Sequence, residues 1–186
     1  MKRIFSGLLL TACLVLTACQ DVVTRVYSTK YPVRAYFKVA SYSELLAVVN
    51  NGGQFGTVRQ VGDQIRMTSP SSSNPYPLDA ISSTFTYGLG GLIVGTNYSL
   101  RLRAYDLACP NCDASSVRRL SLTDDGYARC PSCAMVYNLN DNGSIYSTGK
   151  GLYKKPRGLY RYGIEYKYNG TTVVLSNVPS TSDNDL

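Results

Sequence analysis

Two Cys-x-x-Cys pairs constrain the fold of this chain more than any other feature of its sequence. The pairs are Cys109-Pro-Asn-Cys112 and Cys130-Pro-Ser-Cys133, and seventeen residues separate them. A sharp backbone turn directs both sulfurs of a pair to one point, so two facing pairs match a tetrahedral ion with metal–sulfur bonds of about 2.3 Å. Such an all-sulfur shell suits zinc or iron and argues against magnesium, calcium or manganese. The spacing lies in the range typical of metal sites and predicts one at these four cysteines.

The same cysteines leave a second interpretation open. An exported protein meets an oxidising compartment, where four thiols can form two disulfides. Disulfides within Cys-x-x-Cys pairs tend to be strained and reducible, so this alternative is a redox-active double CxxC thiol/disulfide protein. A thioredoxin-like enzyme would need a βαβ context, and the sequence around the cysteines is rich in β-formers.

The amino-acid composition excludes several classes of enzyme. The 186 residues include no His and no Trp. Without His there is no Ser-His-Asp or Cys-His nucleophile pair, no HExxH metalloprotease, and no His-ligated copper, haem or catalytic zinc. No pair of carboxylates and no activated Ser stands out either. We therefore expect a protein that is not an enzyme.

The N-terminus is typical of an exported protein. Lys2 and Arg3 precede an apolar stretch from residue 4 to 16, and Leu-Thr-Ala-Cys19 follows. This is the order of a secretory signal, and the stretch is shorter than the roughly 20 residues of a membrane span. The ending resembles the bacterial lipobox, which implies a lipid at Cys19 and an anchor in the cell envelope, with the outer membrane as the expected location. An ordinary secreted protein is the alternative. The net charge of +7 would favour nucleic-acid binding. A protein of the cell envelope meets no nucleic acid, so we expect no such partner.

The mature chain shows the period-2 patterns of short strands. Val33, Ala35, Phe37 and Val39 share one face, strands are predicted at 56–61, 64–68, 84–87, 92–94 and 98–105, and a helix begins near Ser43. In the segment 98–105, Leu100 and Leu102 alternate with two arginines and predict the buried face. Residues 69–79 predict a loop, and Asn142-Gly143 and Asn169-Gly170 predict hairpins with type I′ turns. The fold class is mainly β.

Glycines at 88, 90, 91 and 95 suggest a phosphate-binding loop at first sight. A Walker loop requires Lys and Ser/Thr directly after its last Gly and a helix behind it, and neither is present. We interpret this segment as a bend between strands.

The C-terminal half contains a recognisable series of residues: Cys130-Pro-Ser-Cys133, Tyr137, glycines at 143, 149 and 151, then Pro156, Leu159 and a closing β-rich segment. A strand leads into Cys109 before them. With this series, residues 103–175 resemble the second half of a Rieske domain. It implies a small Rieske-like β-sandwich or barrel carrying a metal subdomain of the rubredoxin or zinc-ribbon kind.

The departures from that family concern the ligands. Rieske ligand pairs are CxH and CxxH, whereas here Cys stands at both His positions, so the resemblance implies Cys109, Cys112, Cys130 and Cys133 as ligands. A [2Fe–2S] cluster with four thiolates has a potential nearer about −400 mV than the Rieske range of about −150 to +300 mV. Respiratory quinol oxidation and oxygenase chemistry are therefore not expected.

Structural zinc is the metal we expect. Symmetrical pairs favour one ion between them, and the signal indicates unfolded export, whereas exported iron–sulfur proteins usually leave folded by the twin-Arg route. A closed tetracysteine zinc has no open position for water. An electron carrier with a [2Fe–2S] cluster or a single iron is the alternative.

The most basic stretch is a candidate docking loop for an acidic protein or another envelope partner. It spans 150–161 and contains Lys150, Lys154, Lys155, Arg157 and Arg161. A solvated loop without a partner is the simpler interpretation.

The expected organisation is a signal peptide at 1–18, a lipidated tether at 19–31, a Rieske-like β domain at 32–178 and a polar tail at 179–186. The metal subdomain is placed at about 103–162. The expected function is a membrane-anchored envelope lipoprotein whose tetracysteine site supports a binding or assembly role.

Overall fold

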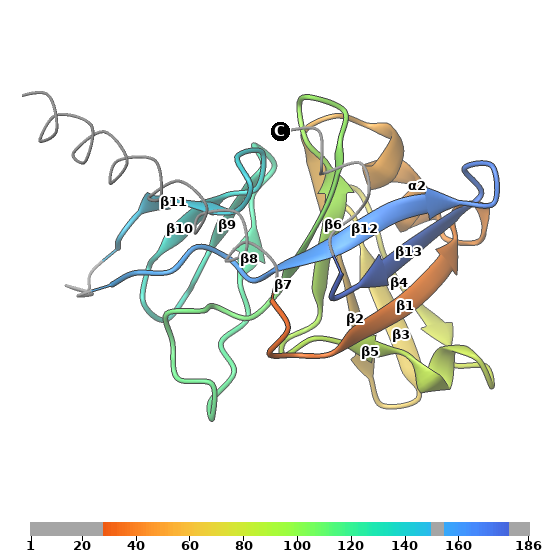
Figure 1. Cartoon of the computed structure of the whole chain (residues 1–186), viewed down its shortest axis with the longest axis horizontal. Coiled ribbons are helices and arrows are strands. Elements are labelled where there is room, and N and C mark those ends of the chain that lie inside the picture. Colours follow the sequence, from red (N-terminus) through yellow and green to blue (C-terminus); the bar gives the residue numbers. More distant parts are fainter. Residues whose placement is uncertain (1–27, 150–154, 179–186) are drawn as a thin grey trace, which may run out of the picture.

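The computed structural model describes residues 28–149 and 155–178. In this part of the chain, thirteen strands form two antiparallel sheets, accompanied by one α-helix and two short 3-10 turns, η1 (Val39–Ser41) and η2 (Ser82–Thr84). The mainly-β class is confirmed. The two sheets lie side by side, the large one on the right and the small one on the left of Figure 1.

The large sheet has nine strands. In spatial order they are β4 (Ser73–Pro77), β3 (Gln64–Thr68), β2 (Gln54–Val61), β6 (Leu92–Thr96), β7 (Leu102–Asp106), β12 (Arg161–Lys167), β13 (Thr172–Ser176), β1 (Val33–Lys38) and β5 (Thr86–Tyr87). The edge strand β5 contacts β2, so the sheet curls back on itself (Figure 1). One apolar core, drawn from strands across the sheet, fills the inside of this curve.

The predicted alternation in β1 is confirmed. Its side chains alternate between buried and exposed, with Val33, Ala35 and Phe37 inside and Val39 following them. In β6, by contrast, every residue is buried, because Leu92 and Val94 face the large core while Ile93 faces a second core. A continuous apolar run is the expected pattern of a strand that is covered on both faces.

The helix α2 (Ser43–Asn50) packs against β2 and β6. It begins at Ser43, as predicted, and ends where Asn50-Asn51-Gly52-Gly53 begins. Its N-cap residue is Tyr42, which makes no side-chain cap hydrogen bond. The Ser43 hydroxyl lies 3.3 Å from a carboxylate oxygen of Glu44.

The predicted loop at 69–79 contains the edge strand β4. Proline is tolerated on an edge strand, which pairs on one side only. The buried carboxylate of Glu44 accepts hydrogen bonds from Ser72 Oγ (2.9 Å), Asn74 Nδ2 and Tyr76 OH (2.7 Å), which alternate along the strand. A single carboxylate thus orders a segment whose composition predicts a loop.

The predicted strand 98–105 is shorter than expected: Leu102 packs against the large core as predicted, but Leu100 lies outside the strand and the arginine face is covered as well. Residues 98–101 form a turn in which Leu100 has a φ of 58° and is 75% exposed. Arg103 in β7 is 5% exposed. Asn97 Oδ1 accepts from the backbone amide of Arg101 and holds the turn before β7 begins. Arg103 is buried because both faces of β7 are covered, with Ala104 in the large core and Tyr105 in the second core.

Both predicted Asn-Gly hairpins are present. Asn142 and Gly143 join β10 to β11, Asn169 and Gly170 join β12 to β13, and all four residues have positive φ. The loops are longer than two residues, since the last pairs before the turns are Asn138 with Ser144 and Lys167 with Thr172.

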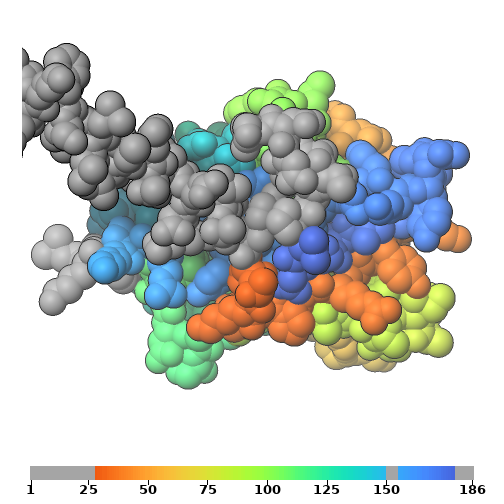
Figure 2. All heavy atoms as spheres, viewed as in Figure 1, coloured from red at the N-terminus to blue at the C-terminus, as the bar shows by residue number. Residues whose placement is uncertain are grey.

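The small sheet is inserted between β7 and β12, at residues 107–160. Its strands are β11 (Ser144–Ser147), β10 (Val136–Asn138), β9 (Tyr127–Arg129) and β8 (Ser121–Leu122), in that spatial order. We call residues 107–160 the insertion. Its core packs against Phe55, Ile93 and Tyr105 on the outer face of the large sheet. The space-filling view shows the segment between β7 and β8 as a green lobe that protrudes at the lower left (Figure 2).

The chain before β1 is bonded to the domain from Ser28 onward. Ser28 N donates to the carbonyl of Arg161 (2.9 Å), and Asn177 Nδ2 donates to the carbonyls of Ser28 (2.6 Å) and Tyr31 (2.7 Å). The predicted signal peptide, the polar tail and most of the predicted tether lie outside the described residues. Among the helices of the described part, none is long and apolar enough to cross a membrane.

Candidate metal centre

Each Cys-x-x-Cys pair forms a tight turn at the end of a strand. The first pair follows β7, where Cys109 N donates to the carbonyl of Arg118 (2.8 Å). The second lies between β9 and β10, where Cys130 N donates to Met135 O (2.8 Å) and Ala134 N donates to Cys130 O (2.9 Å). Ala134 has a φ of 59°, so the chain reverses directly after the last cysteine. Short strands and turns therefore present the two pairs to each other.

The structure brings the four cysteine sulfurs together. All four lie within 4.8 Å of one another, and none of them forms a disulfide. The short approaches join opposite pairs, Cys109 to Cys133 at 3.6 Å and Cys112 to Cys130 at 3.7 Å. A tetrahedron with metal–sulfur bonds of about 2.3 Å has sulfur–sulfur edges of about 3.8 Å. This group of cysteines could hold a metal ion.

Hydrogen bonds from two side chains orient the first pair. Asn111 Nδ2 donates to the hydroxyl of Tyr137 at 2.9 Å, and that hydroxyl lies 3.2 Å from Cys109 Sγ. An amide nitrogen only donates, so the tyrosine oxygen accepts from Asn111 and its own hydrogen is directed to the sulfur. A donor to a ligating sulfur stabilises its thiolate form.

Asn111 also ties the first pair to the chain that returns to the large sheet. Its Nδ2 donates to Arg157 O (2.7 Å), and its Oδ1 accepts from Arg157 N (2.9 Å). The side-chain amide thereby uses both donors and its acceptor. The backbone of residue 157 is fixed beside the cysteines, although 46 residues of sequence separate the two positions.

A glycine supports the second pair. Gly149 has a φ of 64°, and a Cβ at this position would overlap the carbonyl oxygen of Cys133 and the backbone of Ala134. Only glycine allows this close approach, so the chain after β11 packs directly under the second turn.

Burial favours the protonated form of two of the cysteine thiols. Burial raises the pKa of Cys109 to about 11, against the lowering effect of the Tyr137 hydroxyl. Burial and the neighbouring sulfurs also raise the pKa of Cys112. The thiols of Cys109 and Cys112 thus keep their protons at neutral pH, and an ion that binds here has to displace them.

The other predicted site residues have different surroundings. Cys19, Lys150 and Lys154 lie outside the described residues. Lys155 and Arg157 are exposed, on the segment that Asn111 fixes. Arg161 opens β12 and is only 4% exposed, so it does not belong to an exposed docking loop; its position in a strand of the large sheet explains its burial.

Sequence reasoning missed the roles of Asn111 and Gly149. Asn111 is a middle residue of a Cys-x-x-Cys pair, and nothing in its neighbourhood signals a bond to residue 157. Tyr137 entered only as an aromatic position of the Rieske resemblance, without a role for its hydroxyl.

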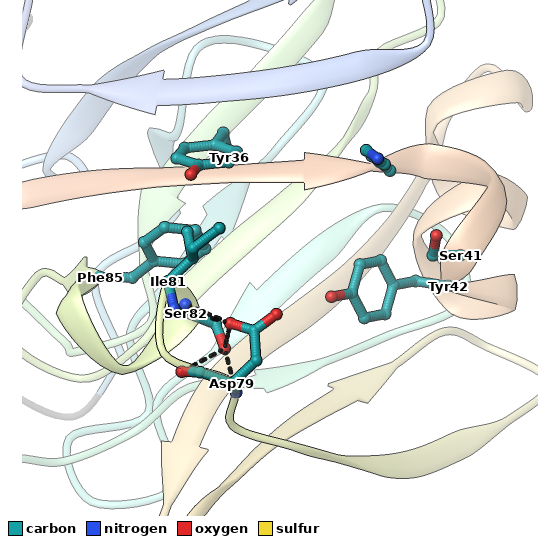
Figure 3. Close-up of a pocket in the computed structure, with 8 residues that line it drawn as sticks. Tyr36, Ser41, Tyr42, Asp79, Ile81, Ser82 and Phe85 are labelled. Carbon is teal, nitrogen blue, oxygen red and sulfur yellow. Dashed lines mark hydrogen bonds between the residues drawn. The ribbon is translucent and has the colours of Figure 1, made fainter.

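A hollow elsewhere on the large sheet lacks comparable chemistry. Its volume is about 240 Å³, and Tyr36, Tyr42, Phe85 and Asp79 line it (Figure 3). Asp79 Oδ1 accepts from the backbone amide and hydroxyl of Ser82 (2.6 and 2.7 Å), which holds the turn η2. The carboxylate therefore has a structural role in this hollow.

Comparisons with known proteins place the chain in no family. No protein-family model matches it, and no curated protein matches it significantly. The function of the chain is therefore inferred from the geometry of the four cysteines.

Proposed function

We propose that the four cysteines bind one structural zinc ion that holds the insertion together. The observation that carries this proposal is the sulfur geometry: four sulfurs within 4.8 Å of one another, with approaches of 3.6 and 3.7 Å between the pairs. These distances are close to the edges of a tetrahedral site for a single ion.

The geometry favours one ion over a [2Fe–2S] cluster. In such a cluster two irons and two bridging sulfides stand between the thiolate pairs, which separates thiolates on different irons. The closest sulfurs here belong to different pairs, and all four fit within 4.8 Å. A two-iron cluster would need the two turns to move apart.

A closed site suits a structural role. Zinc with four thiolates has no position for water or substrate, and the ion supplies cross-linking between two loops. Cys109 and Cys130 are 4% and 0% exposed, and the donors around them serve to fix the sulfurs.

We place this centre in a Rieske-like domain of an envelope lipoprotein that is anchored through Cys19. The insertion of a small metal-binding sheet between two strands of a larger sheet supports the Rieske resemblance. The lipobox supports the anchor. The binding or assembly role would use the segment that the centre orders, where Lys155 and Arg157 are exposed.

A single iron is the second candidate, and one contact favours it. Hydrogen bonds to ligating sulfurs tune iron potentials, and Tyr137 OH lies 3.2 Å from Cys109 Sγ. On this alternative the protein is an electron carrier with the same ligands.

Metal content and visible absorption of the full chain, purified from its native envelope, distinguish these proposals. The zinc proposal expects one zinc per chain and a colourless sample. One iron per chain with visible absorption supports the electron carrier. Metal-free protein with oxidised cysteines would overturn both proposals and favour the double CxxC redox protein. Cys19→Ser tests the anchor separately, because it should release the protein from the membrane fraction.

A further inference from the structure

The glycine-rich turn at 88–91 forms one wall of a second cavity, distinct from the cysteine site. Its volume is about 310 Å³, and it lies where β5 approaches β2. Two arginines line it, Arg59 from β2 and Arg119 from the insertion, and no carboxylate does. Both ionised side chains contribute positive charge to an open, solvent-connected hollow.

Both arginines are held against the turn. Arg119 Nε donates to the carbonyl oxygen of Gly90 at 2.8 Å, which leaves its terminal nitrogens available. The Cβ of Arg59 lies so close to Gly91 that a side chain at 91 would contact it at 2.9 Å. The absence of a side chain at Gly91 leaves room for Arg59 beside the turn.

The charge of Arg59 is uncompensated within the described residues. Arg59 has no hydrogen bond or ion pair there, and the ion pair found in that part of the chain joins Lys167 to Glu165. Directly across the β2–β3 ladder, Arg59 pairs with Arg66. Like charges at opposite positions destabilise a sheet, so an anion beside them would be favourable.

A hydroxyl near the arginines also lacks a partner. Thr86 lines the cavity, and its buried Oγ1 has no hydrogen bond among the described residues. A buried polar atom without a partner is costly, so the wall of the cavity holds a donor that has no acceptor among the described residues.

Two backbone amides of the turn already donate hydrogen bonds to a buried carboxylate. Leu89 N and Gly90 N donate to the buried carboxylate of Asp106, at 2.6 and 2.9 Å. The turn is therefore not a phosphate-binding loop whose amides contact a ligand. The turn supports the cavity wall, and the guanidinium groups of Arg59 and Arg119 are the groups that would bind an anion.

We propose that this cavity binds a phosphate-type oxyanion between Arg59 and Arg119. Guanidinium groups match the geometry of phosphate oxygens with paired hydrogen bonds. The phosphate belongs either to a free anion or to a lipid headgroup, which presents the same chemistry. The cavity is separate from the four cysteines, and phosphate binding does not depend on which metal ion they hold.

The test is a calorimetric titration of the full chain with inorganic phosphate, together with sedimentation binding to phosphatidylglycerol vesicles and phosphatidylcholine vesicles. Arg59→Gln and Arg119→Gln should each weaken binding at least about tenfold, since each removes hydrogen bonds to a charged group. Arg101→Gln is the control, because this arginine lies at the opposite end of β7 and does not line the cavity.

The two assays identify the source of the anion. Arginine-dependent binding of inorganic phosphate supports a free anion. Binding to phosphatidylglycerol vesicles that both substitutions weaken, without binding of inorganic phosphate, supports a headgroup. The proposal is overturned when neither probe binds, or when Arg101→Gln weakens binding as much as the two cavity substitutions. Circular dichroism melting verifies that each variant is folded.

Discussion

The large sheet and the insertion differ in how much apolar core each provides for itself. Within the described part of the chain, the large sheet encloses nineteen buried residues in one cluster, and none of them is a cysteine. The core of the insertion has twelve, of which two are metal-site cysteines and three belong to the large sheet. Apolar burial alone gives only marginal stability to a unit as small as the insertion. The comparison indicates that hydrophobic packing stabilises the sheet, whereas the insertion also depends on its cysteine centre.

The largest effect should follow from the loss of one ligand. In Cys130→Ser the hydroxyl cannot replace the buried thiolate, and structural zinc contributes on the order of 10 kcal/mol in small zinc-binding domains. We expect loss of the metal and rapid amide hydrogen exchange across 107–149, with protection retained in β1, β2 and β6. Ser132→Ala is the matched control, since it alters an exposed, non-ligating residue of the same turn. Unfolding of the large sheet together with the insertion would contradict the comparison.

A core substitution in the large sheet should destabilise that sheet and leave the cysteine centre of the insertion intact. Phe37 is 1% exposed and makes edge-to-face contacts with Tyr42 and Phe85. Phe37→Ala should lower the free energy of unfolding by about 3–5 kcal/mol, as measured by urea denaturation. The metal content should not change. Lys38→Ala, at the exposed neighbouring position, should have almost no effect, and loss of metal in Phe37→Ala would show that the regions are not separable.

Within the insertion, Asn111→Ala tests whether hydrogen bonds support the cysteine centre. The substitution removes the bonds to Tyr137 and to the backbone of Arg157, with an expected cost of about 1–3 kcal/mol. Metal release to a chromogenic chelator and amide exchange at 155–159 should both become faster. Ser115→Ala, on the exposed loop of the same insertion, is the control; equal release rates for both variants would rule out this role of Asn111.

The smallest expected effect concerns pH and the edge strand β4. Burial opposes the charge of Glu44, but hydrogen bonds from Tyr76, Ser72 and Asn74 outweigh it and lower its pKa below the ordinary 4.5. A lowered folded-state pKa contributes stability that is present above the unfolded value and is lost as the pH falls through the folded value. Glu44→Gln should therefore cost about 1 kcal/mol at pH 7, a difference that disappears in acid.

Urea denaturation between pH 7 and pH 3 measures this dependence. Glu165→Gln serves as the control, because Glu165 bonds an exposed lysine on β12. A difference between Glu44→Gln and the unchanged protein that persists at the lowest pH would contradict the role assigned to the carboxylate.

Sequence patterns predicted the local features well. The period-2 face of β1, the strands β2 and β3 and both Asn-Gly turns follow from the character of neighbouring residues. The grouping of the four cysteines follows from their spacing, since each pair needs only one turn to align its sulfurs. These features depend on interactions over a few residues.

Features that depend on distant partners were not predicted. The strand β4 is ordered by Glu44, which is 28 to 32 residues earlier in the chain. Leu100 is exposed because a bond to Asn97 holds the turn ahead of β7, and Arg103 is buried because the insertion covers the outer face of the large sheet. Asn111 bonds the backbone of residue 157, and Arg59 and Arg119 line one cavity only because β2 and the insertion flank one turn. No local pattern encodes such contacts.

X-ray absorption at the metal edge of the purified full chain tests the central claim most directly. A single ion held by Cys109, Cys112, Cys130 and Cys133 predicts four sulfur neighbours at about 2.3 Å, with no nitrogen or oxygen neighbour and no metal–metal distance. A second metal, a mixed shell of sulfur and lighter atoms, or cysteines found only as disulfides would contradict it.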